Sequence, residues 1–505
     1  MKKFKYFVFA GLAVSASLAT AQVPAGYFDQ ALLFSQSSFT YGSTARMQAI
    51  GGTQISLGAD MSSAASNPAG LGFFNRSVFS MTPGMNFNTS SSAYLGDRFN
   101  SFRNNFNIPN IGIVLNANKG NYTEEKFKAG SFAITYNRIN NFNSTLQYRG
   151  RNGISVIDQM IAEAGTTVPE ALPEYPYAAF ENYLIDPEYD TSDQLIGYSS
   201  VVLGNPLQSE YIRTSGGQGQ LNFAWGGNYD DRIYFGGGIG ITTVRYQVER
   251  SYTEEQFLYQ DSVGNDQFDD LIQFTEYNDE YTVSGGGVNA TLGVIFRPVD
   301  FITIGASYIT PTYYSLEDEN GFTQVTNWNN LPLGGGETTN QEDYSSDIII
   351  NQFNLRSPGR INLGASAFLG KLGFISGDVQ FVDYTTSQLR SNDFNETGDN
   401  QVIGELYRDV INYRLGAEFR LDDFRLRAGY AYYGDPYNDG SNYDESRQNF
   451  SGGFGYRGRD YFIDLAVVRS QKNRLFGTYF PTVQGDFVDT ENITTTVSAT
   501  IGFNF

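Results

Sequence analysis

The chain of 505 residues contains no histidine and no cysteine, which excludes Ser-His and Cys-His nucleophilic pairs, histidine acid–base catalysis and zinc sites built from imidazole or thiolate. The formal charge of −21 argues against a nucleic-acid partner, because a phosphate-binding surface needs a basic excess. With 55 Gly, 35 Tyr, 40 Phe and only 17% charged residues, the composition is typical of strands that are apolar on one face. We therefore expect no enzyme activity, no cofactor and no metal, and a chain that holds or moves a molecule.

The first segment has the pattern of an export signal. Lys2 and Lys3 precede an apolar stretch at 6–18, and a small-residue cleavage site ends at Ala21. We expect residues 1–21 to be a signal peptide. A membrane anchor is the weaker alternative, because the apolar stretch is shorter than the ~20 residues that span a bilayer.

The next segment, residues 22–75, does not alternate and is rich in small residues and turn formers. It ends on Asn67, Pro68, Ala69, Gly70 and Leu71. Two interpretations fit this compact segment. It is either an N-terminal extension on the periplasmic side or a hatch that plugs the lumen of a barrel too wide for its own side chains to fill.

Residues 76–505 have a period of two. In the last segment Ile501, Phe503 and Phe505 fall on one face, and Thr500 and Asn504 fall on the other. A soluble sandwich and a barrel both produce this alternation, but export, aromatic abundance and a terminal Phe favour the barrel. We predict an all-β fold, a fourteen-stranded antiparallel transmembrane β-barrel with the hatch in its lumen, in the outer membrane of a Gram-negative bacterium and in contact with its lipids.

Short and long linkers alternate between the predicted strands, as in outer-membrane barrels. Pro298-Val299 and Gly370-Lys371 are tight turns, whereas 149–216, 251–271 and 316–343 are long and polar. We expect these three segments to be extracellular loops. Most of the negative charge falls on them, so the remaining barrel and hatch are close to neutral.

The third predicted strand, at 129–148, begins regularly and then loses its pattern. The irregular positions are Arg138, Asn140, Asn141 and Phe142. A bulge or kink here breaks the ladder and opens a gap in the wall. The alternative is that the strand has left the membrane and entered its loop.

The loop that follows this strand carries apolar residues at helical spacing. Its candidate residues are Ile157, Met160, Ile161, Phe180 and Leu184. They form either an external hydrophobic groove that captures a ligand, for which an adaptable Met is suited, or the small core of the loop itself.

Several motifs occur in a characteristic order. They are Gly42-Ser43 with Ala45-Arg46, the Asn67–Leu71 run, Ser357-Pro358-Gly359-Arg360, Val382-Asp383-Tyr384 and Leu426-Arg427-Ala428-Gly429-Tyr430. In order and spacing they resemble the FadL/TodX family of outer-membrane transporters for hydrophobic compounds, in a Bacteroidetes-like branch. The resemblance implies a hatch in the lumen, passive diffusion of a hydrophobic ligand caught by external loops, and lateral release through a kinked third strand.

We therefore expect an outer-membrane channel for hydrophobic small molecules such as long-chain fatty acids. The alternative is a FadL-related barrel that acts as a protein-binding or shuttle component of type IX secretion, with a secretion-system partner in place of a small molecule. Co-isolated lipid favours the first function and co-isolated cargo protein favours the second.

Overall fold

The computed structural model describes residues 26–36, 42–118, 125–438, 443–478 and 487–505. The expected signal peptide, residues 1–21, lies outside the described residues. One antiparallel sheet closes on itself, because β1 (Val78–Tyr94) pairs with β22 (Phe487–Asn504) from Val78↔Asn504 to Ala93↔Asp489. The wall of this barrel has fourteen strands, which confirms the predicted fold class.

Four of the wall strands are interrupted and consist of two segments each. Between β1 and β22 the wall is built by β2 (Asp97–Asn118), β3 (Phe127–Asn141) with β4 (Ser144–Arg151), β7 (Asn205–Tyr229), β8 (Ile233–Gln260), β10 (Ile272–Val299), β11 (Ile302–Ile309) with β12 (Tyr313–Gly334), β14 (Ile349–Arg356) with β15 (Arg360–Phe368), β16 (Gly373–Asp383) with β17 (Gln388–Ser391), β18 (Asp409–Leu421), β19 (Phe424–Tyr433), β20 (Arg447–Arg457) and β21 (Tyr461–Gly477).

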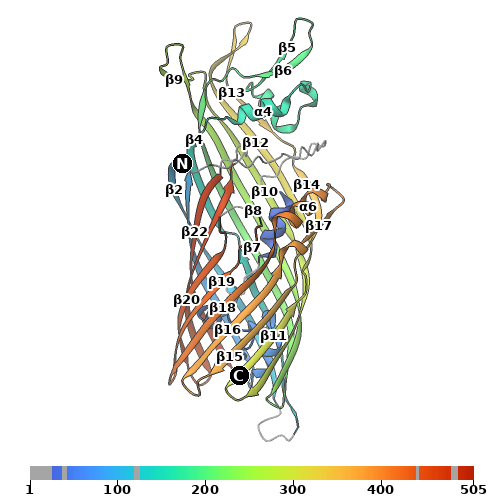
Figure 1. Cartoon of the computed structure of the whole chain (residues 1–505), viewed down its shortest axis with the longest axis vertical. Helices are drawn as coiled ribbons and strands as arrows, with labels where there is room; N and C mark the ends of the chain where they lie inside the picture. The colour runs from blue at the N-terminus through green and yellow to red at the C-terminus, as the bar shows by residue number, and fades with distance from the viewer. Residues whose placement is uncertain (1–25, 37–41, 119–124, 439–442, 479–486) are drawn as a thin grey trace, which may run out of the picture.

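Figure 1 shows a tall barrel with one elaborate end and one plain end. The elaborate loop end carries β5 (Asp186–Tyr189), β6 (Leu195–Ser199), β9 (Asp266–Phe268), β13 (Glu337–Ser345), α4 (Val156–Ala164), η2 (Pro169–Ala171) and α5 (Glu174–Glu181). The opposite turn end carries short turns and the C-terminus. Two further elements, η3 (Tyr384–Thr386) and α6 (Thr397–Leu406), follow β16 and β17. No helix among the described residues is long and apolar enough to cross a membrane.

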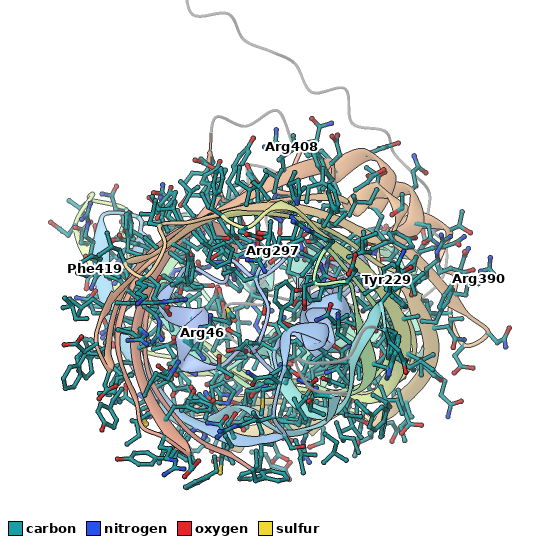
Figure 2. The ribbon with its side chains drawn as sticks, turned by 90° about the horizontal axis from the view of Figure 1, so that it is seen from below. Arg46, Tyr229, Arg297, Arg390, Arg408 and Phe419 are labelled. Atoms are coloured by element: carbon teal, nitrogen blue, oxygen red, sulfur yellow. The ribbon has the colours of Figure 1, made fainter. Side chains whose placement is uncertain are left out.

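The wall exposes apolar side chains and buries polar ones. On β15, Ile361 and Leu363 are 51% and 47% exposed, whereas Arg360 and Asn362 are 9% and 0% exposed. Figure 2 likewise shows Phe419 outside the ring of strands. A soluble sandwich has the reverse arrangement, so the ambiguity of the alternating pattern is resolved in favour of a membrane-spanning barrel.

The strands are longer at the loop end than the sequence pattern predicts. β7 begins at Asn205, β8 continues to Gln260 and β12 continues to Gly334, so the expected loop bounds 149–216, 251–271 and 316–343 are too wide. Beyond the lipid layer the outer face no longer has to be apolar. The ladder therefore continues through residues such as Glu317 without the alternation that marks it in sequence.

The N-terminal segment lies inside the lumen, as the hatch interpretation predicts. Its helices are α1 (Tyr27–Ser35), α2 (Ala45–Ala49), α3 (Ser63–Ser66) and η1 (Pro68–Phe73). Residues of the segment bond to inward-facing wall residues: the backbone N–H of Ala45 donates to Thr500 Oγ1 (2.7 Å), and that of Gln54 donates to Asp378 Oδ2 (2.8 Å). We call residues 42–75 the lower hatch, and α1 is a separate upper element.

Candidate functional site

The third wall strand is broken where the sequence pattern fails. β3 ends at Asn141 and β4 begins at Ser144. β3 pairs with β2 only from Asn110↔Asn137 to Asn118↔Ala129, and within the described residues β4 pairs with β7 alone. The part of β2 that precedes Asn110 therefore has no strand partner on this side, and we call this interruption the wall gap.

Local sequence explains the break. A bulge in the β3–β7 pairing falls between Arg138 and Asn140, and the β1–β2 pairing shifts at the level of Pro109, which has no N–H to donate to a ladder. The Arg138 guanidinium turns to the backbone, where Nη2 donates to Gly216 O (2.7 Å) and to Asn141 Oδ1 (3.2 Å). These contacts replace regular pairing and hold the irregular backbone in place.

β4 lies on the inner side of the wall. Inward-facing side chains of β1 donate to its backbone carbonyls: Asn88 to Asn143 and Ser92 to Gln147. The ring of Tyr94, also inward-facing on β1, meets the Tyr148 ring edge to face, with centroids 4.9 Å apart. Side chains of β1, and not backbone hydrogen bonds, connect β4 to this part of the wall. β4 is therefore displaced into the lumen.

A cavity of about 230 Å³ lies in the lumen beside β4. It is bounded by α1 on one side and by the strands β4, β7, β8, β10, β21 and β22 on the other. Its apolar lining includes Leu32, Leu33, Leu146, Ile212, Val248 and Phe476. This lumen cavity is therefore largely apolar, and β4 lies between it and the wall gap.

Three cations also line the lumen cavity. Arg250 pairs with Glu210 (2.5 Å) and Lys472 pairs with Glu445 (3.5 Å). The third, Arg474, forms no ion pair with any described residue. Arg474 interacts electrostatically with the Asp29 carboxylate, which lines the same cavity, so largely apolar walls stand beside charged groups, as an amphiphilic ligand requires.

Sequence reasoning missed Lys472 and Arg474. β21 continues to Gly477 and turns both side chains inward, onto the lumen cavity. The signal was present in the alternation of Lys472 and Arg474 with Asn473 and Leu475, but no apolar face accompanies it at this height.

The upper helix α1 lines one side of the lumen cavity. It buries Leu32 and Phe34 in a cluster with wall residues, and its start is tied to the segment around α6. There the Phe28 N–H donates to Asp399 Oδ1 (3.1 Å), and Tyr407 donates its hydroxyl to Phe28 O (2.9 Å). The loop segment and α1 are therefore packed together.

The other end of α1 meets the broken strand. Asn140 Nδ2 donates to Leu33 O (3.2 Å), and the Phe142 ring lies edge to face with Phe34, centroids 5.8 Å apart. Two of the predicted kink residues therefore contact α1. Asn141 Oδ1 accepts a hydrogen bond from the Arg138 guanidinium. Its Nδ2 donates to Asn105 Oδ1 of β2 (3.3 Å), on the far side of the wall gap.

The hatch motif fixes the lower hatch to the wall. Asn67 Nδ2 donates to Ile55 O (2.6 Å) and approaches the carbonyls of Val294 (3.5 Å) and Ala306 (3.4 Å), while its Oδ1 caps Ala69 N (3.2 Å). The motif residues Pro68, Ala69, Gly70 and Leu71 form η1 and are buried.

Wall glycines make room for the lower hatch. A Cβ at Gly293 would lie 1.8 Å from Asn67 Oδ1, one at Gly305 would lie 2.0 Å from Ile55 O, and one at Gly429 would lie 2.1 Å from Gly51 N. Similar close approaches to the hatch occur at Gly226, Gly236, Gly364, Gly416 and Gly453. The hatch backbone therefore lies directly against the wall on many strands, although a cavity of about 290 Å³ lies between the lower hatch and wall residues such as Glu418 and Arg457.

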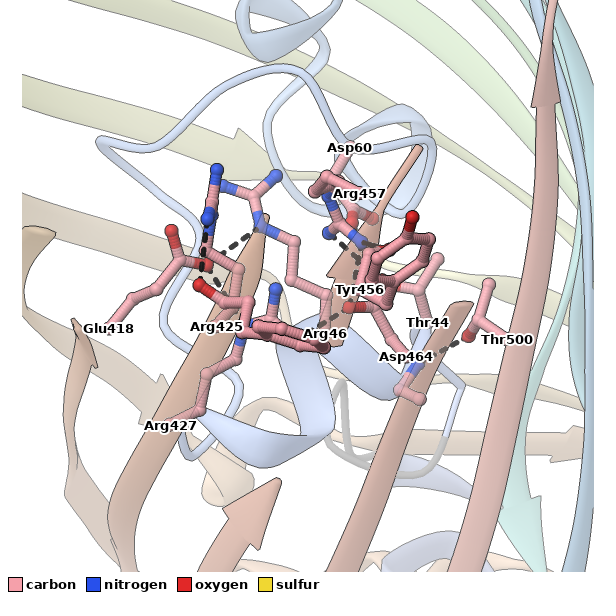
Figure 3. Close-up of polar contacts among 12 residues, drawn as sticks. Thr44, Arg46, Asp60, Glu418, Arg425, Arg427, Tyr456, Arg457, Asp464 and Thr500 are labelled. Carbon is pink, nitrogen blue, oxygen red and sulfur yellow. Dashed lines mark hydrogen bonds and ion pairs between the residues drawn. The ribbon is translucent and has the colours of Figure 1, made fainter. Parts of the chain in front are cut away.

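A buried ion network joins the lower hatch to β18, β19 and β20 (Figure 3). Glu418 lies between Arg46 of α2 (3.7 Å) and Arg427 (2.9 Å), and Asp464 lies between Arg427 (2.7 Å) and Arg457 (2.9 Å). Figure 2 shows Arg46 inside the ring of strands. Removing one member leaves an opposite charge buried, so the network resists displacement of the hatch.

The candidate groove residues of the long loop lie in a closed core. Ile157, Met160 and Leu184 are 3%, 0% and 0% exposed and pack with Trp328. Ile161 and Phe180 are partly buried at its edge. In this conformation these residues form the interior of the loop-end domain, and their part in capturing a ligand stays a prediction.

The molecule is thus a membrane-spanning barrel of fourteen strands with a hatch in its lumen, a chamber above the hatch and a break in its third strand. Comparison of the sequence with protein-family models and with curated proteins finds no match.

Solved structures do match the fold. The P. putida toluene transporter TodX aligns with 92% of this chain and 99% of its own at a TM-score of 0.50 and 11% identity. A Pseudomonas aeruginosa FadL homologue aligns with 92% and 98% at a TM-score of 0.51 and 13% identity. The chain therefore has the fold of the FadL and TodX barrels, and the predicted resemblance is confirmed at that level.

Proposed function

We propose that the protein is an outer-membrane channel for passive uptake of hydrophobic molecules, with long-chain fatty acids as its ligands. A molecule enters from the loop end, occupies the lumen cavity and leaves sideways through the wall gap. No reaction is part of this function, and the named structural neighbours are a toluene transporter and a FadL homologue.

The observation that carries the proposal is the combination of a hatch that contacts the wall on many strands with a broken third strand. Below the lumen cavity, the glycines and the Arg46–Glu418 pair leave the lower hatch in direct contact with the barrel. Beside the cavity, β4 carries Leu146 on the cavity lining and has no pairing to β2. A hydrophobic molecule in the chamber therefore lies beside a strand that is not paired to β2, and above a hatch that contacts the wall on many strands.

The ligand class follows from the lining of the lumen cavity. Its apolar side chains accept an acyl chain, and the guanidinium of Arg474 accepts a carboxylate through charge-assisted hydrogen bonds. A neutral hydrocarbon would make no use of this cation. Long-chain fatty acids satisfy both requirements.

The direct test is uptake of radiolabelled oleate by cells with the gene, without it, and complemented with the wild type. Uptake that depends on the gene and shows no energy requirement supports the proposal. Equal uptake in all three strains, in a host lacking other barrels of this fold, overturns it.

The type IX shuttle function predicts a different outcome in the same strains. Affinity purification of the barrel would then recover cargo proteins or translocon subunits, and the purified barrel would carry no fatty acid. Recovery of bound fatty acid without a protein partner separates the channel from the shuttle.

A further inference from the structure

A groove lies on the outside of the wall, at a level where three neighbouring strands are interrupted. The interruptions separate β11 from β12, β14 from β15 and β16 from β17. The first two contain Pro311 and Pro358, which have no N–H to donate to a ladder. The groove has a volume of about 850 Å³, within the range of ~300–1,000 Å³ that is typical of small-molecule sites. We call it the outer groove.

Two cross-strand rows of residues line the outer groove, each crossing β8, β10, β12, β14 and β17. Residues directly opposite one another in an antiparallel pair share a face of the sheet. The first row is Ile241, Val288, Tyr313, Arg356 and Gln388, and the second is Thr243, Gly286, Ser315, Asn354 and Arg390.

These rows give the outer groove an apolar end and a cationic end. Ile241 and Val288 are 45% and 51% exposed at the first end, and Arg356 and Arg390 are exposed at the other. Between them the floor at Gly286 is bare backbone. A ligand with one hydrocarbon chain and one anionic group fits this distribution.

Neither Arg356 nor Arg390 forms an ion pair with a described residue. The carboxylates next along these strands, Glu317 and Asp393, instead accept hydrogen bonds from Gln352, from its Nε2 (3.0 Å) and its backbone N–H (2.7 Å). Two uncompensated cations are unusual in a chain of net charge −21.

The arginines face the membrane at the height where the apolar surface ends. Figure 2 shows Arg390 outside the ring of strands. Toward the turn end, the outward residues after the break are Ile361 and Leu363, which are apolar. Toward the loop end the outward residues are mixed, with Glu317 and Gln352 near the exposed Ile348 and Ile350. Arg356 and Arg390 therefore lie at the level of lipid headgroups, where phosphate is the available anion.

We propose that the outer groove binds one anionic phospholipid of the surrounding membrane, with its phosphate on Arg356 and Arg390 and an acyl chain laid over Gly286 toward Ile241 and Val288. Guanidinium groups bind phosphate through paired, charge-assisted hydrogen bonds, and the lack of a side chain at Gly286 provides the depth that the chain requires.

Native mass spectrometry of the purified full chain in detergent tests this site. The probes are phosphatidylglycerol and phosphatidylcholine with the same acyl chains, titrated separately. The variants are R356Q/R390Q, the groove-filling S315F, and R469Q as a matched control, since Arg469 is an exposed arginine on β21 and outside the outer groove. A heat-modifiable gel shift confirms that each variant is folded.

The proposal predicts one tightly bound phosphatidylglycerol per chain and at least tenfold weaker phosphatidylcholine binding. R356Q/R390Q and S315F each weaken phosphatidylglycerol binding at least tenfold, while R469Q matches the wild type. Unchanged binding in folded R356Q/R390Q overturns the site. Full competition by soluble glycerol phosphate also overturns it, because the groove would then be a phosphate site without an acyl-chain requirement.

Discussion

Asn140, at the bulge of β3, donates from its Nδ2 to the backbone carbonyl of Leu33 in α1 (3.2 Å). This contact joins the irregular wall strand to the helix that covers the lumen cavity. A residue that breaks the pattern of its own strand is therefore a partner of the N-terminal segment, 107 positions earlier in the chain.

Removing this contact should loosen α1. Asn140→Ala deletes the partly buried hydrogen bonds that its Nδ2 donates to Leu33 O and Gln36 O and the one that its Oδ1 accepts from Asn141 N–H, each worth about 0.5–1.5 kcal/mol. We expect hydrogen exchange of the α1 amides to accelerate by roughly 2- to 12-fold. Asn143→Ala is the matched control, because Asn143 bonds to Asn141 and Gly216 and not to α1. Equal acceleration in both variants would contradict the assignment.

The buried network should hold the lower hatch. Glu418→Gln leaves the guanidinium groups of Arg46 and Arg427 without their shared carboxylate. We expect a loss of about 3–5 kcal/mol in the free energy of unfolding, measured by urea titration in micelles. The exposed pair of Arg76 and Asp460 provides the control: Asp460→Asn should cost less than about 1 kcal/mol. Similar losses for both variants would show that the network does not stabilise the hatch.

Close approach of the hatch makes Gly305 sensitive to a single methyl group. In Gly305→Ala the new Cβ would lie 2.0 Å from Ile55 O, so either the hatch or the strand must shift. We expect a destabilisation of about 1–3 kcal/mol and faster exchange at residues 54–57. Gly452→Ala, whose Cβ would be 3.7 Å from its nearest neighbour, should have little effect. A stable Gly305→Ala with unchanged exchange would contradict direct hatch–wall contact.

Docking of α1 should strengthen as the pH falls. Burial raises the pKa of Asp29 and of Asp399 above the ordinary value of 3.8. Because both carboxyls bind protons more readily when α1 is docked, docking is most favourable below 3.8 and weakens as the pH rises through their raised pKa values. Hydrogen exchange of α1, corrected for intrinsic rates, should follow this trend, and D29N/D399N should remove it. If acidification weakened the docking of α1, the predicted direction of the pH dependence would be wrong.

The charge of Arg474 should select the ligand. Arg474→Met keeps the volume of the lining and removes the cation, so oleate affinity should fall about tenfold, equivalent to one charge-assisted hydrogen bond of ~1.5 kcal/mol. Affinity for a neutral hydrocarbon such as toluene should not fall. Isothermal titration with both ligands measures this difference, and an equal change for the two would exclude a carboxylate contact.

The sequence predicted the barrel because its physical cause is local. Lipid on one side and a polar lumen on the other impose a period of two on each strand, as in Ile361 to Leu369. The irregularity of the third strand was also visible in the sequence, because Arg138 and Asn140 occupy positions where the alternation requires apolar residues. Pro311 and Pro358 were equally informative, because each marks a place where the structure interrupts a wall strand.

Contacts between distant segments were beyond prediction. Phe28 and Asp399 are separated by 371 positions, and nothing near either residue marks the other as its partner. The same holds for Arg46 and Glu418, whose pairing depends on the depth at which α2 enters the lumen. The sequence indicated a hatch, but only the contacts in the structure distinguish the lower hatch from α1.

The central claim is that ligand leaves through the wall gap, and a reversible cross-link tests it directly. The chain has no cysteine, so R103C/S144C creates a unique thiol pair across the gap, where Arg103 Nη1 lies 3.4 Å from Ser144 O. R469C/T495C, a directly paired position of β21 and β22, is the control. The account predicts that a short reducible thiol cross-linker abolishes oleate uptake in the first pair only and that reductant restores it; undiminished uptake through a fully cross-linked gap would contradict it.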